Sequence, residues 1–380
     1  MTTARTGSMP MIFCLMMGSL DEVGAMIRLS FRRKNGLLRL AVAVFFIISS
    51  LLTGVFMTRE AALITLQGQT MGTDYSVKYI DWADGRALPS PAAIKAQIER
   101  RLHEVNAEMS PYLPDSAISQ FNQLRDDRWF LLPPDFATVL REAVALHEVT
   151  QGGLDVSLGA LVNLWGFGPE PRRDSPPPPD AIAARTSGMG QFELAEESGM
   201  WFVRKHAPLL QLDLCAIAKG YGVDAVAGVL AAADIGDFLV EIGGELYGRG
   251  VNPQRQPWWV GVEHPLQRTQ HVAVVALDGL ALATSGDYRN FFVDDNGAMQ
   301  SHVIDPRSGR PVRHDIASLS VLAPTAMRAD GLATGLYALG AEAAWAVATQ
   351  QDLAVCLVTR RDGDFHRILS PAFQAQLQFA

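Results

Sequence analysis

The sequence predicts an α+β fold, on the evidence of its strand-like and helix-like patterns. Residues 258–262 and 272–277 alternate apolar and polar side chains as neighbouring antiparallel strands do. Residues 91–106 and 134–150 repeat apolar side chains every three or four positions, which is typical of amphipathic helices. Strands that follow one another in a meander, mixed with several helices, indicate the α+β class. No G-x-G-x-x-G follows an early strand and no G-K-[ST] loop occurs, so neither kind of nucleotide site is supported.

The first half of the chain begins with a predicted strand region and continues with two helices. Within Leu66–Tyr79, apolar residues alternate at Tyr75, Val77 and Tyr79, and Gly72 is expected at a turn or a close approach of backbones. The first helix, residues 91–106, has its apolar positions at Ile94, Ile98, Leu102 and Val105. The second, residues 134–150, has them at Phe136, Val139, Leu140, Val144 and Leu146.

The second half contains further predicted strands and helices. We expect a helix over residues 223–233, and then a buried strand over residues 238–245 that runs into a glycine turn. The run Ala317–Leu322 alternates and predicts a strand with one buried face, and residues 353–358 predict a fully buried one. After Pro324 the pattern becomes helical, with leucines spaced by three and four at Leu332, Leu336 and Leu339.

Composition limits the classes of function. Hydrophobic residues make up 48% of the chain, which indicates a well-filled core and not disorder. The net charge of −8, without a basic block outside the N-terminus, argues against nucleic acid as a partner. The three cysteines, Cys14, Cys215 and Cys356, are too few and too scattered for a disulfide framework or a thiolate zinc site.

The N-terminus has the pattern of a membrane-targeting segment. Four basic residues precede an almost unbroken apolar run from Leu40 to Met57: Arg28, Arg32, Arg33 and Lys34. We predict a cytoplasmic segment at residues 1–36, with a start at Met26 as a further hypothesis, and a signal-anchor or transmembrane segment at residues 37–57. An uncleaved anchor is favoured over a cleaved signal, because no small-x-small cleavage site is visible. Positive-inside logic then sends the domain of residues 60–380 across the membrane.

Residues 169–180, which include four consecutive prolines at residues 176–179, predict an exposed loop. Such a loop could mark a domain boundary. We interpret it as an insertion, because the glycine-rich motifs on both sides look like parts of one site.

Several polar residues stand inside apolar, glycine-rich sequence: Asp155, Asp213, Lys219, His302, Asp305, Asp330 and Thr334. Each has a structural explanation when taken alone. Asp213 or Asp330 could cap a helix, Lys219 could be solvated, and His302 or Thr334 could be satisfied by a local hydrogen bond. Asp330 and Thr334 are one helical turn apart, so their oxygens could instead form half of a Mg²⁺ site. The recurrence of glycine favours a ligand site, because bare backbone allows close approach to a bulky polar ligand.

Seven short motifs occur in one order from about residue 64 to the C-terminus. They are Met71-Gly72-Thr73, Gly153-Leu154-Asp155, Asp213-Leu214-x-x-Ile217-Ala218-Lys219-Gly220, Ile242-Gly243-Gly244-Glu245, Thr284-Ser285-Gly286, His302-Val303-Ile304-Asp305-Pro306-x-x-Gly309 and Ala329-Asp330-x-x-Ala333-Thr334. Each motif is weak alone, but together and in this order they resemble the FAD:protein FMN transferase family, the ApbE-like flavin transferases.

The resemblance implies an ApbE-like fold of mixed or antiparallel sheets with flanking helices, preceded by an N-terminal membrane segment. Residues 60–380 would be the flavin transferase catalytic domain, on the periplasmic side of a bacterial-type inner membrane. The implied activity is Mg²⁺-dependent. The enzyme would cleave FAD, attach FMN through a phosphoester bond to a threonine of an acceptor flavoprotein, and release AMP. The implied acceptor is a membrane-bound electron-transfer subunit.

The resemblance also implies roles for individual residues. FAD would be surrounded by Met71, Tyr112, Gly153, Leu154, Asp155, Asp213, Lys219 and Ile304. The backbone carbonyl of Ala216, the carboxylate of Asp330 and the hydroxyl of Thr334 would hold Mg²⁺. His302 would be the base for the incoming hydroxyl, and Asp305 would either orient His302 or serve the turn before Pro306. Cys215 stands where the family has a small hydroxyl residue, and we expect this to matter little because Ala216 binds through its backbone.

These residue types suit the chemistry. A cation that bridges pyrophosphate oxygens removes the charge that hinders attack, and Mg²⁺ prefers hard oxygen ligands. A histidine that takes the proton of a threonine hydroxyl contributes a factor of roughly 10²–10⁴ in rate. Two alternatives remain open. One is a periplasmic FAD pyrophosphatase that yields free FMN and AMP, and the other is a non-catalytic FAD-binding protein.

Overall fold

The computed structural model describes residues 61–377, with gaps at residues 83, 172, 174, 186–187, 268–269, 287–290, 294–296, 298 and 362, and without the side chains of residues 291, 292 and 299. The chain divides into two units, Met1–Arg59 and Glu60–Ala380, and all described residues belong to the second. The predicted membrane segment at residues 37–57 and the hypothetical start at Met26 lie outside the described residues. Within the described ranges, no helix is both long and apolar enough to span a bilayer.

The second unit is built on an eight-stranded sheet in which all neighbouring strands are antiparallel. The strands lie in the order β1-β2-β6-β7-β10-β15-β16-β17. Their bounds are β1 (Ala62–Thr70), β2 (Thr73–Asp81), β6 (Phe238–Ile242), β7 (Glu245–Arg249), β10 (Leu280–Gly286), β15 (Ile316–Ala323), β16 (Ala354–Arg361) and β17 (Asp364–Leu369). The predicted α+β fold with an antiparallel sheet is confirmed.

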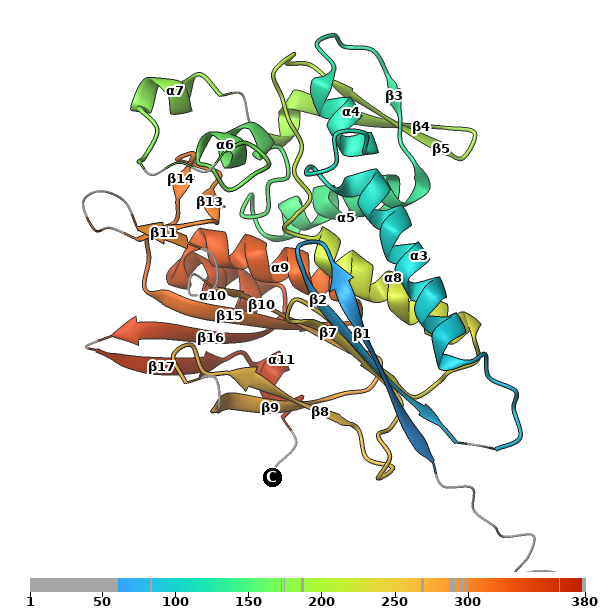
Figure 1. Cartoon of the computed structure of the whole chain (residues 1–380). Coiled ribbons are helices and arrows are strands. Elements are labelled where there is room, and N and C mark those ends of the chain that lie inside the picture. Colours follow the sequence, from blue (N-terminus) through green and yellow to red (C-terminus); the bar gives the residue numbers. More distant parts are fainter. Residues whose placement is uncertain are drawn as a thin grey trace, which may run out of the picture. The chain divides into compact units, whose positions relative to one another are not determined.

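Helices cover one face of this sheet (Figure 1). Those that contact it are α3 (Pro91–Met109), α8 (Ala218–Ala232), α9 (Ala326–Leu339) and α10 (Ala341–Gln350), while α5 (Pro134–Val149) packs against α9. The opposite face is covered by the hairpin of β8 (Trp258–Glu263) and β9 (His271–Leu277) and by α11 (Pro371–Gln374). The sheet therefore separates two apolar cores, and the core under the helices is the larger one.

The central strand β15 corrects one prediction. Its alternation predicted a single buried face, but all of its residues are buried. Leu319 and Val321 belong to the core under the helices, whereas Ala317 and Leu322 belong to the core under the β8–β9 hairpin. The serines between them are buried as well, because the strand lies inside a sheet that is covered on both faces.

The start of helix α8 corrects a second prediction. Helices α3 and α5 confirm the ranges expected from periodicity, but α8 begins at Ala218 rather than Val223. Glycines lower helix propensity, and those in the first turns of α8 disguised its start. Packing requires the glycine at position 220, whereas Gly222 faces the flexible end of a side chain. A Cβ at Gly220 would collide with the backbone of α9, and one at Gly222 would lie 2.9 Å from Cε of Met71. Lys219 therefore stands on a helix and not in a loop.

Two tight hairpin turns lie side by side at one end of the sheet. The β1–β2 turn consists of Met71 (φ 49°) and Gly72 (φ 72°), and the β6–β7 turn consists of Gly243 (φ 61°) and Gly244 (φ 103°). Positive φ at both turn positions matches the right-handed twist of the paired strands. The amide of Gly243 donates to the carbonyl of Asp74 at 3.2 Å, so the two turns are joined. The turn expected at Gly72 and the glycine turn after β6 are both confirmed.

Smaller elements extend from the helical side of the sheet (Figure 1). They are α4 (Ala117–Gln123), β3 (Phe130–Leu131), α6 (Gly159–Leu164), α7 (Pro179–Ala183), the 3₁₀ turn Met189–Gln191, β4 (Phe192–Glu197), β5 (Met200–Lys205), β11 (Phe291–Val293), β12 (Met299–Ser301), β13 (Ile304–Asp305) and β14 (Arg310–Pro311). A separate apolar cluster joins α6, α7 and β13 through Leu161, Trp165, Ile182 and Ile304. The described residues between 169 and 180 are exposed except for Pro177.

Candidate active site

Three charged side chains from three different elements form a cluster: Lys219 of α8, Glu245 of β7 and Asp330 of α9. The Nζ of Lys219 lies 3.1 Å from Oε1 of Glu245 and 3.4 Å from Oδ1 of Asp330. The Glu245 and Asp330 side chains are 5% and 3% exposed, whereas that of Lys219 is 31% exposed. The ammonium thus bridges two buried carboxylates and also reaches solvent.

Burial and charge act in opposite directions on the pKa values of this cluster. Burial lowers the pKa of Lys219, but the charges of Asp330 and Glu245 outweigh burial and raise that pKa above its usual value. Burial raises the pKa of Glu245 to about 7 and also raises the pKa of Asp330, although Lys219 opposes both shifts. When both carboxylates are ionised, the single ammonium balances only one of them, and a bound cation would neutralise the other.

Helices α8 and α9 cap each other's N-termini. Oδ2 of Asp330 accepts the N–H of Gly220, in the first turn of α8, at 2.9 Å. In return, the carboxylate of Asp224 in α8 accepts the first two N–H groups of α9 at 2.8 and 2.9 Å. Helix α9 also has its own cap, the side chain of Thr325. The alternative in which Asp330 caps its own helix is therefore wrong, because Asp330 lies in the second turn and caps the neighbouring helix.

The carbonyl of Ala216 lies just before the first residue of α8, outside the hydrogen bonds of the helix. If α8 began one turn earlier, the N–H of Gly220 would bind this carbonyl, four residues before it. That N–H binds Asp330 instead, at 2.9 Å, so the helix does not use the carbonyl of Ala216. Asp330 and Thr334 stand one turn apart on α9, and the hydroxyl of Thr334 lies 3.0 Å from Oγ of Ser285. A hydroxyl has two acceptor lone pairs, so this hydrogen bond leaves Thr334 able to ligate a cation.

The chemistry of these three groups fits Mg²⁺, which takes carbonyl, carboxylate and hydroxyl oxygens. In the part of the chain that the structure describes, no group of three or more His, Cys, Asp and Glu side chains could hold a metal. The predicted ligand set is not a group of that kind, because it combines one carboxylate with a backbone carbonyl and a hydroxyl. Asp330 also belongs to the charge cluster, where one ammonium faces two carboxylates, and this charge balance also favours a cation there.

The motif at Gly153 packs against α9. A Cβ at Gly153 would collide with the carbonyl of Gly335, and Leu154 also lies against this glycine. Asp155 is held by a local turn, because its Oδ1 accepts hydrogen bonds from both the backbone N–H and the hydroxyl of Ser157. Gly153 and Leu154 are therefore placed beside the helix that carries Asp330, and packing alone already requires a glycine at position 153.

Tyr112, Asp213 and Cys215 lie around the cluster. Oδ1 of Asp213 accepts the N–H of Cys215 at 2.8 Å. Tyr112 is 57% exposed and Cys215 is exposed, yet burial by surrounding protein atoms raises the pKa of both side chains. Asp213 adds to both shifts, and Lys219 lies close enough to Cys215 to oppose its shift. The exposed side chains of Tyr112 and Cys215 therefore share a surface with Asp213 beside the charge cluster.

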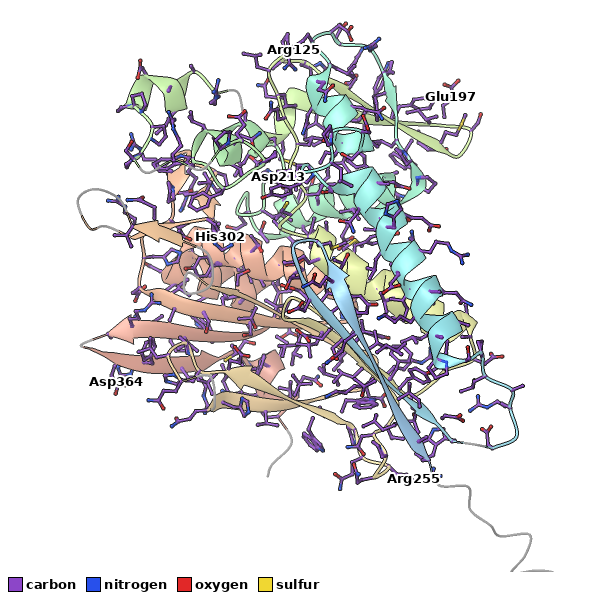
Figure 2. All side chains as sticks on the ribbon, viewed as in Figure 1. Arg125, Glu197, Asp213, Arg255, His302 and Asp364 are labelled. Carbon is purple, nitrogen blue, oxygen red and sulfur yellow. The ribbon has the colours of Figure 1, made fainter. Side chains whose placement is uncertain are left out.

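His302 is connected to this surface through Phe167. The hydroxyl of Tyr112 donates to the carbonyl of Phe167 at 3.1 Å, and the Phe167 ring meets the His302 ring edge-on with centroids 6.4 Å apart. Figure 2 shows Asp213 and His302 on the side of the sheet that carries α9. The contacts thus bring Tyr112, Asp213, Lys219, His302 and Asp330 into one region of the molecule.

The residues that follow His302 pack and turn the loop that carries it. Ile304 is 4% exposed and packs in the α6 cluster, so its side chain supports the loop that carries His302. Two roles were open for Asp305, and the contacts favour the turn. Its Oδ1 accepts the backbone N–H and Nε–H of Arg307, and its carbonyl accepts the N–H of Gly309.

Sequence reasoning assigned no role to Glu245, Asp224 or Ser285. Glu245 carried a signal, because an acidic residue directly after a glycine pair and a buried strand is unusual. Asp224 carried none, since an aspartate inside a predicted helix is normally a surface residue. Its capping role depends on a second helix more than a hundred positions away, at Ala326 and Met327.

The chain is similar to known proteins over most of its length. A model of the ApbE family matches residues 71–357. The FAD:protein FMN transferase of Haemophilus influenzae is 42% identical over 321 residues, which cover 83% of this chain and 92% of the relative. That of Vibrio cholerae is 40% identical over 328 residues, covering 86% and 96%.

Two solved structures have the same fold. The flavin transferase ApbE from Vibrio cholerae aligns with a TM-score of 0.76 at 39% identity, over 83% of this chain and all of its own. The apo form of the Pseudomonas stutzeri flavinyl transferase ApbE aligns with a TM-score of 0.76 at 33% identity, over 83% of this chain and 97% of its own.

Proposed function

The chain belongs to the ApbE family, and we propose that it is a Mg²⁺-dependent FAD:protein FMN transferase. In this proposal the enzyme cleaves the pyrophosphate of FAD, attaches FMN through a phosphoester bond to a threonine of an acceptor flavoprotein, and releases AMP. The class of reaction is that of the named relatives. The roles of individual residues are argued from the contacts of this chain.

The charge cluster is the observation that carries the proposal. An ammonium that is held by two buried carboxylates and still reaches solvent is suited to a phosphate oxygen. When both carboxylates are ionised, the negative charge that the ammonium leaves unbalanced is suited to a cation next to that phosphate. A site that only bound the isoalloxazine or adenine ring would have no need of either feature.

The remaining residues would hold FAD on the surface beside the charge cluster. Tyr112 is exposed there and would stack on one of the rings. Met71 stands on the β1–β2 turn, with its side chain against α8, the helix that carries Lys219. When bound by Ala216, Asp330 and Thr334, Mg²⁺ would neutralise the pyrophosphate and stabilise the departing AMP.

His302 would act on the acceptor. In the transfer step, its imidazole takes the proton from the threonine hydroxyl. The threonine oxygen forms a bond to the phosphorus of the FMN half, and the P–O bond to AMP breaks, so AMP leaves with the electron pair. A threonine side chain belongs to another protein, so the base has to stand where that protein can reach it.

The location of the enzyme is also part of the proposal. The apolar run at residues 37–57 would anchor the chain in a bacterial-type inner membrane, with the catalytic domain on the periplasmic side and a membrane electron-transfer subunit as acceptor. Protease digestion of intact spheroplasts tests this. A domain that is degraded without lysis agrees with the proposal, and one that is degraded only after lysis contradicts it.

The activity is tested by mixing the protein with FAD, Mg²⁺ and a threonine-bearing acceptor domain. Flavin fluorescence that remains on the acceptor in a denaturing gel, together with AMP release, is the expected result. Free FMN and AMP without labelled acceptor would mean a pyrophosphatase, and no AMP at all would mean a flavin-binding protein. Asp330→Ala is expected to abolish Mg²⁺-dependent AMP release, because it removes the only carboxylate of the ligand set. Release at the parent rate would refute the metal assignment.

A further inference from the structure

Lys219 binds the two carboxylates of the cluster unequally. Its Nζ lies 3.1 Å from Glu245 and 3.4 Å from Asp330. Charge-assisted N–H···O bonds are strongest at roughly 2.7–2.9 Å, so the contact with Asp330 is the weaker one. Oδ2 of Asp330 is engaged by the N–H of Gly220. Oδ1 is therefore the oxygen through which Asp330 would bind a metal, and Lys219 occupies it.

One carboxylate oxygen of Glu245 makes no hydrogen bond to the described residues. Its Oε1 accepts from Lys219, but its Oε2 is buried and has no hydrogen-bond partner among the described residues. A buried acceptor without a partner destabilises a protein, and native structures contain few of them. The ammonium of lysine has three N–H donors. The free oxygen of Glu245 therefore offers a second acceptor to an ammonium that gives up Asp330.

We propose that Lys219 is a placeholder for the metal at Asp330, and that Glu245 is the positioning residue that holds the ammonium when the metal enters. The inference rests on the proposed function and adds to it a role for Glu245. In the exchange, the metal replaces the ammonium at Oδ1 of Asp330, and the ammonium gains Oε2 of Glu245. No proton is transferred and no covalent bond changes. The chain thus keeps a cation beside Asp330 both with and without the metal. The buried carboxylate therefore always has a counter-ion.

The role of Glu245 predicts how metal affinity responds to substitution. Glu245→Gln keeps the shape of the side chain and removes its charge, so Asp330 becomes the one charged partner of Lys219 in the cluster. The lysine then competes more strongly with the metal. We expect Mn²⁺, used as a paramagnetic probe, to bind about tenfold more weakly, a change of about 1.4 kcal/mol. The measurement is electron paramagnetic resonance titration of the full-length chain in detergent, without FAD.

A second substitution tests whether the effect passes through Lys219. Lys219→Met removes the competing cation, so the double variant with Glu245→Gln is expected to bind Mn²⁺ at least as tightly as the parent. The matched control is Glu142→Gln, because Glu142 pairs with Arg328 of α9 at 2.7 Å but lies outside the cluster. Its Mn²⁺ affinity is expected to equal that of the parent. Thermal melting followed by circular dichroism checks that each variant is folded.

Two results would overturn the inference. One is parental Mn²⁺ affinity in Glu245→Gln. The other is a loss of affinity that persists in the double variant, since Glu245 would then act on the metal directly. Asp330→Asn in the same titration tests the proposed function separately. If Asp330→Asn bound Mn²⁺ as tightly as the parent, the metal site itself would be misassigned, whatever Glu245→Gln does.

Discussion

The two halves of the proposed site are built in different ways. The cation half, Lys219, Glu245 and Asp330, stands on two helices and a central strand that are joined by reciprocal caps. The base half, His302, stands on the loop between β12 and β13 and is backed by the small α6 cluster. Charges that act on a pyrophosphate have to be fixed before the substrate arrives, which rigid elements achieve. A base that serves a side chain of another protein has to be reachable, which suits a loop.

The largest effect that separates the halves is expected from His302→Gln. Loss of the base removes proton transfer from the acceptor hydroxyl, so we expect FMN transfer to fall by about 10²–10⁴. Mn²⁺ affinity should stay at the parent value, because the cation half is intact. The two measurements are covalent flavin on the acceptor and Mn²⁺ titration without substrate. Loss of metal affinity in this variant would show that the halves are not independent.

The mutual caps provide the next test, because α9 has two caps of different kinds. Asp224→Ala removes the cap that α8 supplies, and Thr325→Ala removes the cap that α9 supplies itself. Each is expected to lower the free energy of unfolding by about 0.5–2 kcal/mol in urea denaturation. Only Asp224→Ala should also weaken Mn²⁺ binding, because only Asp224 ties α9 to the helix next to Ala216. Equal metal affinities in the two variants would refute a positioning role for Asp224.

Local pattern predicted the fold class, most of the elements and the positions of the motifs. Periodicity placed α3, α5 and the β8–β9 hairpin within a few residues, because each is an amphipathic element with its own signal. It failed where tertiary contacts overrode local preference. Gly220 and Gly222 look like helix breakers, yet both lie inside α8, and close packing against the backbone of α9 requires Gly220. The serines of β15 look solvent-facing, yet they are buried, because the sheet is covered on both faces.

The same limit applies to the site. Asp330 and Thr334 were predicted as a pair because their spacing is local to one helix. Glu245 and Asp224 act across elements, one on Lys219 and the other on the start of α9, and no spacing in the sequence expresses such contacts. For Asp305, the sequence left two roles open, one in the turn and one toward His302. Only the contacts of Arg307 with its carboxylate favour the turn.

The smallest effect on FMN transfer is expected from the loss of a hydrogen bond that supports only the base half. Nε1 of Trp165 donates to the carbonyl of Gly309 at 2.9 Å, next to the turn that follows His302. Trp165→Phe keeps an aromatic ring and leaves that buried carbonyl without its donor, which destabilises the fold by about 1–3 kcal/mol. We expect FMN transfer to fall only a few-fold, because the loop is loosened and not lost. Mn²⁺ affinity should not change.

Trp258→Phe is the matched control for Trp165→Phe. Its Nε1 donates to the carbonyl of Arg249 at 3.0 Å, but this bond is only partly buried, and Trp258 belongs to the core on the other face of the sheet. We expect it to lower the urea midpoint by less than Trp165→Phe does and to leave FMN transfer at the parent rate. If Trp258→Phe slowed transfer as much as Trp165→Phe, lost stability alone would explain both variants. A slower rate in Trp165→Phe alone would show that the α6 cluster positions the loop that carries His302.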